Sequence, residues 1–236
     1  MIYINHAKRS IFIHIPKTGG SHIGPILVKY YGFTNYIHVL QKKRPDHDAI
    51  TNNSNKSLKM TKTNKFDTSF FNKTFGLLMY CKTSDYLNKE MNMDDYKWAH
   101  YIKFCFIRNP YVRALSGWRH FRQILNVEKH FYTYINQKDI MNNISDIEYG
   151  HIFMSQKKHI VNEYGDCGVN IIGRYEHVKK DLSMILKRIG FEEINHPDNY
   201  FTELSKKEEI ILERKTVDKI NELFEDDFEM FHYSKL

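Results

Sequence analysis

The sequence is poor in cysteine and contains no paired-cysteine motif. Its three cysteines, Cys81, Cys105 and Cys167, lie far apart, and none belongs to a CxxC pair. An odd number of widely spaced cysteines argues against a disulfide framework and against a zinc site. This usage fits a reducing compartment.

Long apolar runs are also missing. No stretch approaches the roughly 18 consecutive apolar residues of a membrane-spanning helix. The N-terminal sequence MIYINHAKRS lacks the charged start and the apolar core of a signal peptide. We therefore expect a cytoplasmic protein without a membrane span.

The charge and the length limit the possible partners and the number of domains. The 236 residues carry a net charge of +7, which favours anionic partners such as nucleotides or acidic polymers. No nucleic-acid-binding motif is present, so we expect no nucleic acid partner. We predict a single domain over residues 1–236, with a polar exposed loop at about 41–74.

The apolar pattern predicts strands that alternate with helices. Such alternation is typical of an α/β fold with a central, mainly parallel sheet flanked by helices. The expected strands span residues 10–15, 75–80, 101–107 and 169–173; the expected helices span about 22–31, a segment after Pro110, 178–189 and about 205–224.

The stretch IFIHIPKTGGSH, residues 11–22, combines a buried strand with a loop rich in glycine and hydroxyl groups. Glycines let backbone N–H groups approach an anion, and a following helix N-terminus adds positive potential. Lys17 supplies a charge. The loop is not a Walker A motif, because Pro16 stands where that motif has its second glycine. Anion binding and a merely structural turn both remain open on loop chemistry alone.

A second polar cluster follows the strand at 101–107. Arg108 comes at the end of this strand, and Ser116 lies eight residues on, about two helical turns away. If both strands are parallel, Arg108 and Lys17 meet at one sheet edge, where open α/β sheets bind ligands. Two anion-binding points there suggest a ligand with two separated phosphates.

These segments resemble the Golgi-type carbohydrate sulfotransferases and their bacterial relatives. FIHIPKTGGSH is similar to their 5′-phosphosulfate loop, and KFCFIRNPYVRALSGW to their 3′-phosphate motif. HIFMSQKKHIV, VNIIGRYEHVKKDLSMILKRIGF and DDFEMFHY continue the resemblance in the expected order. It implies a P-loop-like three-layer α/β fold and the donor 3′-phosphoadenosine 5′-phosphosulfate (PAPS). It implies no metal.

The resemblance also assigns roles to residues of the donor site. It implies that Lys17 stabilises the leaving oxygen, that Arg108 and Ser116 hold the 3′-phosphate, and that Tyr175 lies against the adenine. A packed aromatic residue at the edge of the core is the alternative for Tyr175. The 5′-phosphosulfate would be held by residues of the first loop, namely Pro16, Lys17, Thr18, Gly19, Gly20, Ser21 and His22.

The general base is where the sequence departs from the family. Many relatives have a histidine after the strand that precedes the 3′-phosphate segment, whereas this chain has Met79-Tyr80-Cys81-Lys82-Thr83. Lys82, or a histidine such as His38 or His47, are the candidate bases, and we favour His38. The third possibility is that the protein binds nucleotide without transferring sulfate. His100 is a poor candidate, because it begins the strand that ends at Arg108, about 25 Å away.

The acceptor side is less specified. His151 and Gln156 match an HxxxxQ segment of the family and are predicted either to line the acceptor cleft or to stabilise a loop. A carbohydrate, and so a glycan partner, is the acceptor that the resemblance implies. The alternatives are a nucleotide-binding phosphoryl transferase and a non-catalytic nucleotide-binding module.

Overall fold

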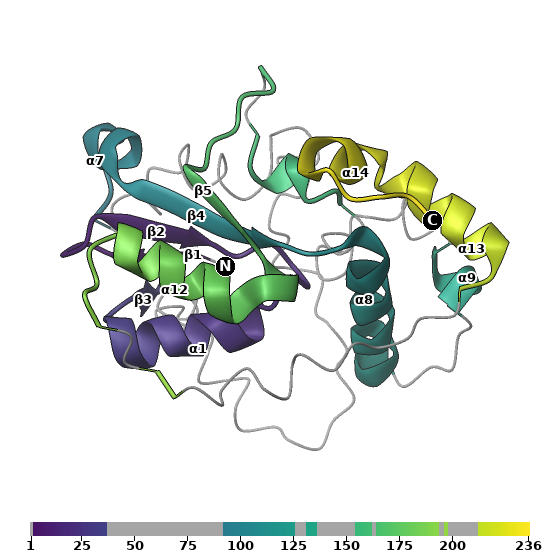
Figure 1. Cartoon of the computed structure of the whole chain (residues 1–236), viewed down its shortest axis with the longest axis horizontal. Coiled ribbons are helices and arrows are strands. Elements are labelled where there is room, and N and C mark those ends of the chain that lie inside the picture. Colours follow the sequence, from purple (N-terminus) through teal and green to yellow (C-terminus); the bar gives the residue numbers. More distant parts are fainter. Residues whose placement is uncertain are drawn as a thin grey trace, which may run out of the picture.

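The computed structural model describes residues 2–36, 92–125, 131–135, 154–161, 164–193, 196–197 and 212–236. These ranges contain a five-stranded sheet with the strand order β3-β1-β2-β4-β5 (Figure 1). The strands are β1 (Ile2–Asn5), β2 (Ser10–Ile13), β3 (Thr34–Asn35), β4 (Ile102–Ile107) and β5 (Ile171–Arg174).

The sheet of the described residues is mainly parallel, as predicted. β2 pairs with β4, and β4 with β5, in parallel, whereas β1 pairs antiparallel with both of its neighbours. β1 therefore opposes the direction of the other strands. The strand predicted at 75–80 and the loop predicted at about 41–74 lie outside the described residues.

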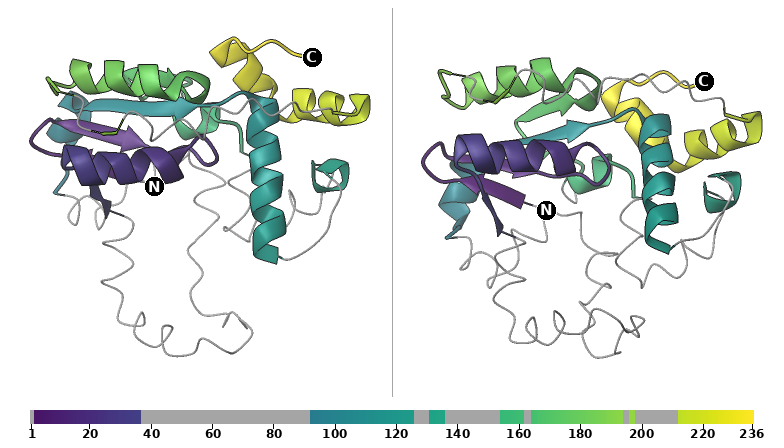
Figure 2. Two further views of the ribbon diagram at one scale, coloured as in Figure 1. Left: turned by 60° about the horizontal axis from the view of Figure 1, so that its bottom comes forward. Right: turned by 90° about the horizontal axis from the view of Figure 1, so that it is seen from below.

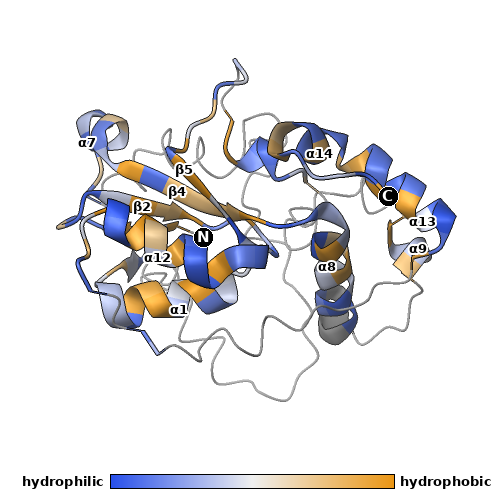
Figure 3. Ribbon diagram, in the orientation of Figure 1, coloured by the Kyte–Doolittle hydropathy of each residue, from blue (hydrophilic) through white to orange (hydrophobic). Residues whose placement is uncertain are grey.

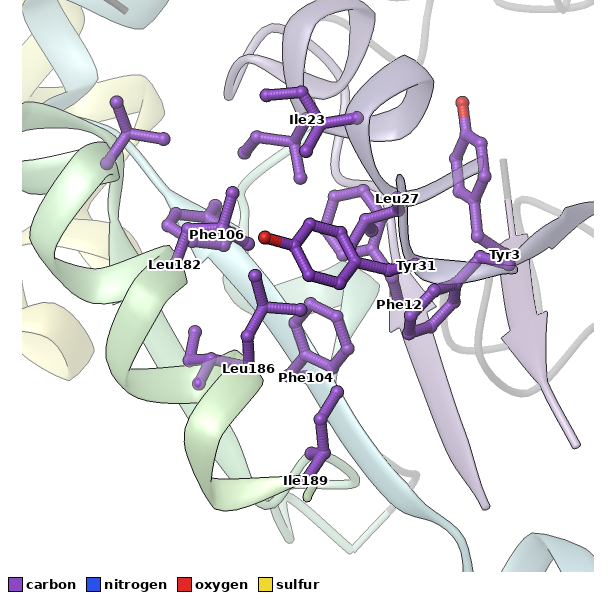
Figure 4. Close-up of a cluster of buried hydrophobic side chains, with 14 of the residues drawn as sticks. Tyr3, Phe12, Ile23, Leu27, Tyr31, Phe104, Phe106, Leu182, Leu186 and Ile189 are labelled. Carbon is purple, nitrogen blue, oxygen red and sulfur yellow. The ribbon is translucent and has the colours of Figure 1, made fainter. Parts of the chain in front are cut away.

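Helices cover both faces of the sheet, which gives three layers. Side chains alternate along β2, so that Phe12 belongs to one apolar cluster while Ile11 and Ile13 belong to the other. The Phe12 side packs against α1 (Gly20–Tyr31) and α12 (Val178–Arg188), as Figures 2 and 4 show.

The opposite face packs against α7 (Asp95–His100) through Trp98 and against α14 (Glu225–Phe231) through Phe231. The strands and the inner faces of the helices are apolar, while polar residues lie along the outer face of α12 (Figure 3).

A third apolar cluster lies beyond the end of β4. The chain turns there into α8 (Pro110–Leu125), which packs with α9 (Phe131–Ile135), α13 (Arg214–Leu223) and part of α14 (Figure 1). Asn109 starts α8 as predicted, because its side-chain oxygen accepts from the backbone N–H of Tyr111 at 3.0 Å. This group of helices stands next to the carboxyl ends of the parallel strands.

Two helix boundaries differ from those predicted. α1 begins at Gly20, earlier than expected, so Pro25 falls beyond the first turn. Pro25 has no N–H, so the carbonyl of Ser21, four residues earlier, loses the helical hydrogen bond that another residue at this position would donate. The C-terminal helix is divided at Phe224 into α13 and α14, and the predicted capping residues Ser205 and Glu208 lie outside the described residues.

Within the part of the chain that the structure describes, no helix combines the length and the apolar character that crossing a membrane requires.

The core of the α12 layer offers a test of this packing. Leu186 is fully buried between α12 and the sheet, whereas Met184 on the same helix is 53% exposed. Leu186→Ala should lower the free energy of unfolding by about 2–5 kcal/mol, because it removes buried methyl groups and leaves a cavity. The matched control, Met184→Ala, should stay within about 0.5 kcal/mol in urea denaturation. Equal effects of the two variants would contradict the assigned layer.

Candidate functional site

Three parallel strands deliver polar residues to one edge of the sheet. The loop with Lys17 follows β2, Arg108 follows β4, and Tyr175 opens the short 3₁₀ helix η2 (Tyr175–His177) directly after β5. Ligands of open α/β sheets bind outside the carboxyl ends of such strands. The two segments that the sequence marked as anion-binding therefore meet where a ligand site is expected.

The loop after β2 has an unusual backbone. Lys17 has a φ of 67° and Gly19 a φ of 89°, so both residues adopt left-handed backbone conformations. Glycine adopts this conformation without strain, whereas lysine does not. Such conformations cost of the order of 1–3 kcal/mol for a non-glycine residue and are frequent in ligand clamps. The Thr18 hydroxyl donates to the carbonyl of Ile15 at 2.8 Å, which closes the loop. Thr18 is buried, so its hydroxyl proton serves the loop itself.

At the start of α1, the amides of His22 and Ile23 donate to the carbonyl of Gly19 at 2.9 and 3.0 Å. Gly19 is the N-cap residue and contributes no side-chain bond. Amides that come before this point in a helix have no partner within the helix and point outward. Gly20 must be small, because a Cβ there would lie 1.9 Å from Cδ2 of His14. The helix thus presents its N-terminus beside Lys17, and Ser21 is exposed there.

Arg108 lies against this loop. Its Nη1 donates to the carbonyl of Lys17 at 3.4 Å. Burial lowers the pKa of Lys17, and the positive charge of Arg108 lowers it further. Two cations held this close repel each other, so a bound anion would relieve the repulsion and be attracted by both.

Tyr175 contacts both Arg108 and the loop after β2. The Arg108 guanidinium lies 4.9 Å from the centre of its ring, and the ring packs so closely on Gly19 that a Cβ there would lie 1.9 Å from Cε2. The Tyr175 hydroxyl shares a hydrogen bond of 3.2 Å with Nδ1 of His22. Only 8% of Tyr175 is exposed. Its ring is therefore engaged by the protein, in line with the packed-aromatic alternative; contact with adenine stays a prediction.

Gln156 holds the backbone of Arg108. Its Oε1 accepts from the Arg108 N–H at 2.8 Å, and its Nε2 donates to the Arg108 carbonyl at 2.9 Å. The residue is fully buried just before the 3₁₀ helix η1 (Lys157–His159). This geometry favours the stabilising role over the predicted acceptor contact, because both ends of the amide are used.

A buried carboxylate, Asp227 of α14, organises the region behind the site. It accepts from Nε2 of Gln156 at 3.2 Å and from the backbone N–H of Lys157 at 3.0 Å. Nη1 of Arg113 lies 4.0 Å from the Asp227 carboxylate, and both side chains are almost completely buried. Nε of Arg113 donates to the carbonyl of Pro16 at 3.0 Å. Asp227 is thus linked through Arg113 to the first loop and through Gln156 to Arg108.

α8 carries two further polar residues on the face that includes Arg113. Ser116 and His120 follow Arg113 at helical spacing, and both are half-buried. Burial lowers the pKa of His120, and the charge of Lys17 lowers it further. The pKa of His22, at the start of α1, is also lowered, by burial and by the positive charge of Arg108. Both imidazoles therefore favour the neutral form at neutral pH.

Several predicted residues lie outside the described residues: His38, His47, Lys82 and His151. Their candidate roles therefore stay predictions. Among the side chains that are described, no group of three or more histidine, cysteine, aspartate or glutamate residues could hold a metal ion.

Sequence reasoning overlooked Arg113, His120 and Asp227. His120 stands one helical turn after Ser116, so the spacing from a predicted ligand residue was an available signal. Arg113 and Asp227 carry no such local signal, because a charged residue in a helix is usually exposed and their pairing joins segments over a hundred residues apart.

Comparison with known proteins gives one family match. Residues 1–234 match the model of the sulfotransferase family. No curated protein and no solved structure matched the chain.

The Arg113–Asp227 pair can be tested by removing one charge. Asp227→Asn should lower the free energy of unfolding by about 3–5 kcal/mol, because it leaves the buried guanidinium uncompensated. The matched control is Asp218→Asn, which breaks the exposed Arg214–Asp218 pair on α13 and should change stability by less than about 1 kcal/mol. Chemical denaturation of both variants measures the difference; indistinguishable stabilities would show that Asp227 is not an anchor.

Proposed function

The chain belongs to the sulfotransferase family, and we propose that it moves a sulfuryl group from PAPS to a hydroxyl or amine of a carbohydrate. The observation that carries this proposal is the meeting of Lys17 and Arg108 at the carboxyl ends of β2 and β4. Two cations from separate segments suit a donor that carries two separated anionic groups.

The loop and the helix start suit the 5′-phosphosulfate. Backbone amides at the N-terminus of α1 and the ammonium of Lys17 would bind its oxygens, in the manner of P-loop-like folds. Arg108 would bind the 3′-phosphate with Ser116 from α8, because guanidinium groups and hydroxyls are strong donors to phosphate. Pro16, Thr18, Gly19 and Gly20 would shape this loop rather than carry charge.

The reaction needs charge stabilisation at one atom. The acceptor oxygen or nitrogen forms a bond to sulfur while the bond from sulfur to the bridging oxygen breaks. Negative charge grows on that oxygen, and a lysine already placed there stabilises it as the bond breaks. Lys17 is partly buried and lies near the positive charge of Arg108. Because partial burial reduces solvent screening, its ammonium would interact more strongly with an anion.

The acceptor assignment rests on charge and family. The net charge of +7 suits an acidic glycan. Gln156 would act on this side only by positioning Arg108, since its amide is bound to that residue.

Donor binding is the direct test. In calorimetry without Mg²⁺, the protein should bind adenosine 3′,5′-bisphosphate more tightly than ATP, because Lys17 and Arg108 would contact different phosphates. Tight ATP binding that requires Mg²⁺ would instead indicate a phosphoryl transferase. Binding of the bisphosphate without any sulfate transfer to sugars in mass spectrometry would indicate a binding module.

The two cations should differ in their effects. Arg108→Ala should weaken bisphosphate binding by about 2–4 kcal/mol, as expected when a bound charge loses its partner. Lys17→Ala should lower kcat far more than it weakens binding, because its interaction strengthens in the transition state.

Lys180→Ala, at an exposed position of α12, is the matched control and should leave both quantities unchanged. A Lys17→Ala variant with altered KM but normal kcat would refute the role given to Lys17.

A further inference from the structure

We propose that His120 of α8 is the general base that takes the proton from the acceptor. This inference rests on the function proposed above. It assigns the base to the described part of the chain, in contrast to the candidates His38 and Lys82.

The position of α8 brings His120 toward the donor loop. α8 begins at the end of β4 and extends past the loop that precedes α1, as both views of Figure 2 show. Arg113 fixes the contact, because its Nε donates to the carbonyl of Pro16. Ser116 and His120 follow at i+3 and i+7, so they lie along the same face of the helix. His120 stands about 10 Å farther along the axis than Arg113.

The loop and α8 are therefore in direct contact at Arg113. Lys17 follows Pro16 directly, so its side chain starts at the point where Arg113 joins α8 to the loop. The positive charge of Lys17 lowers the pKa of His120, as expected for two groups on neighbouring elements.

The half-burial of His120 suits a base. Arg113 and Gln156 are fully buried and act on the protein itself, whereas His120 keeps an accessible surface. A base must reach a substrate proton within about 3 Å, and a buried side chain would not. Both a neutral imidazole and an accessible surface are present at this position.

Burial and positive charge both favour the neutral form of His120. Burial lowers its pKa, and the charge of Lys17 lowers it further. Arg108 from the end of β4 and His22 from α1 share the same site, and Arg113, Arg119 and Arg122 lie on α8 itself. A pKa below 6.5 leaves the imidazole unprotonated at neutral pH and able to accept a proton.

The step balances without a further reactant. The acceptor hydroxyl oxygen forms the new bond to sulfur, and the bond from sulfur to the bridging oxygen breaks to release adenosine 3′,5′-bisphosphate. The hydroxyl proton passes to an imidazole nitrogen of His120 and then to solvent. The growing negative charge of the bisphosphate near Lys17 helps the imidazole to hold the proton.

His22 is the competing imidazole. Its Nδ1 already shares a hydrogen bond with the Tyr175 hydroxyl, and it belongs to the first turn of α1, beside the predicted phosphosulfate. The position of His22 in the donor loop region suits donor binding. His120 belongs to α8, a different element from the one that would hold the phosphosulfate.

An NMR titration tests the location without any acceptor. The imidazole signal of His120, assigned by its loss in His120→Gln, should titrate below pH 6.5 in the native protein. In Lys17→Met the midpoint should move up toward 6.5, because the neighbouring charge is gone. A midpoint unaffected by Lys17→Met would overturn the proposal.

Kinetics test the role. Sulfate transfer from PAPS to a panel of 4-nitrophenyl glycosides should show kcat/KM that falls with decreasing pH below 6.5, as the base becomes protonated. In His120→Ala, kcat should drop by about 10²-fold and this limb should vanish. Bisphosphate affinity and thermal stability should stay unchanged. The control His100→Ala alters an exposed histidine stacked on Tyr96 and should keep the native profile.

The outcomes separate the two proposals. Unchanged turnover and an unchanged limb in His120→Ala would overturn the role of His120 alone, as would a limb that vanishes only in His22→Asn. A limb at pH 8 or above would assign the base to Lys82. Absence of transfer by the native protein to every glycoside, despite bisphosphate binding, would overturn the proposed function and the base with it.

Discussion

The buried carboxylate of Asp227 is the constraint on which the arrangement of the site depends. It lies in α14, far along the chain from the loop and from Arg108, yet it binds the side chains that hold both. A charge without solvent is costly unless it is paired and hydrogen-bonded. Asp227 therefore requires Arg113, Gln156 and the Lys157 amide to stay in place, and these fix the backbone of Pro16 and Arg108.

This network explains how a lysine and an arginine, both with flexible side chains, can form a site of defined geometry. Lys17 and Arg108 have long, flexible side chains, but the backbone on which each stands is held from behind. Tyr175 adds a rigid surface that contacts Gly19 and the Arg108 guanidinium at once. Preorganised charge of this kind costs little reorganisation when an anion arrives, which is the main source of electrostatic catalysis.

The parts of the fold that follow local rules were predictable. Pro16 and the two glycines marked the end of β2 and the start of α1, Gly32 marked its end, and Asn109 with Pro110 marked the start of α8. The parallel pairing of β2, β4 and β5 followed from strands that alternate with helices. The placement of Lys17 beside Arg108 followed in turn, because parallel strands end at the same edge.

What escaped prediction depends on distant pairs or on competing uses of one side chain. The burial of Asp227 depends on Arg113 of α8 and Lys157 of η1, and no local pattern in α14 predicts it. Gln156 resembled a substrate ligand, yet the nearby Arg108 backbone takes both ends of its amide. The backbone of Lys17 has a consequence for the stability of the loop. A glycine at this position would relieve the left-handed strain and would remove the charge as well. A change from lysine to glycine here would therefore trade the positive charge for backbone relief, so the loop carries this charge only at a cost in stability.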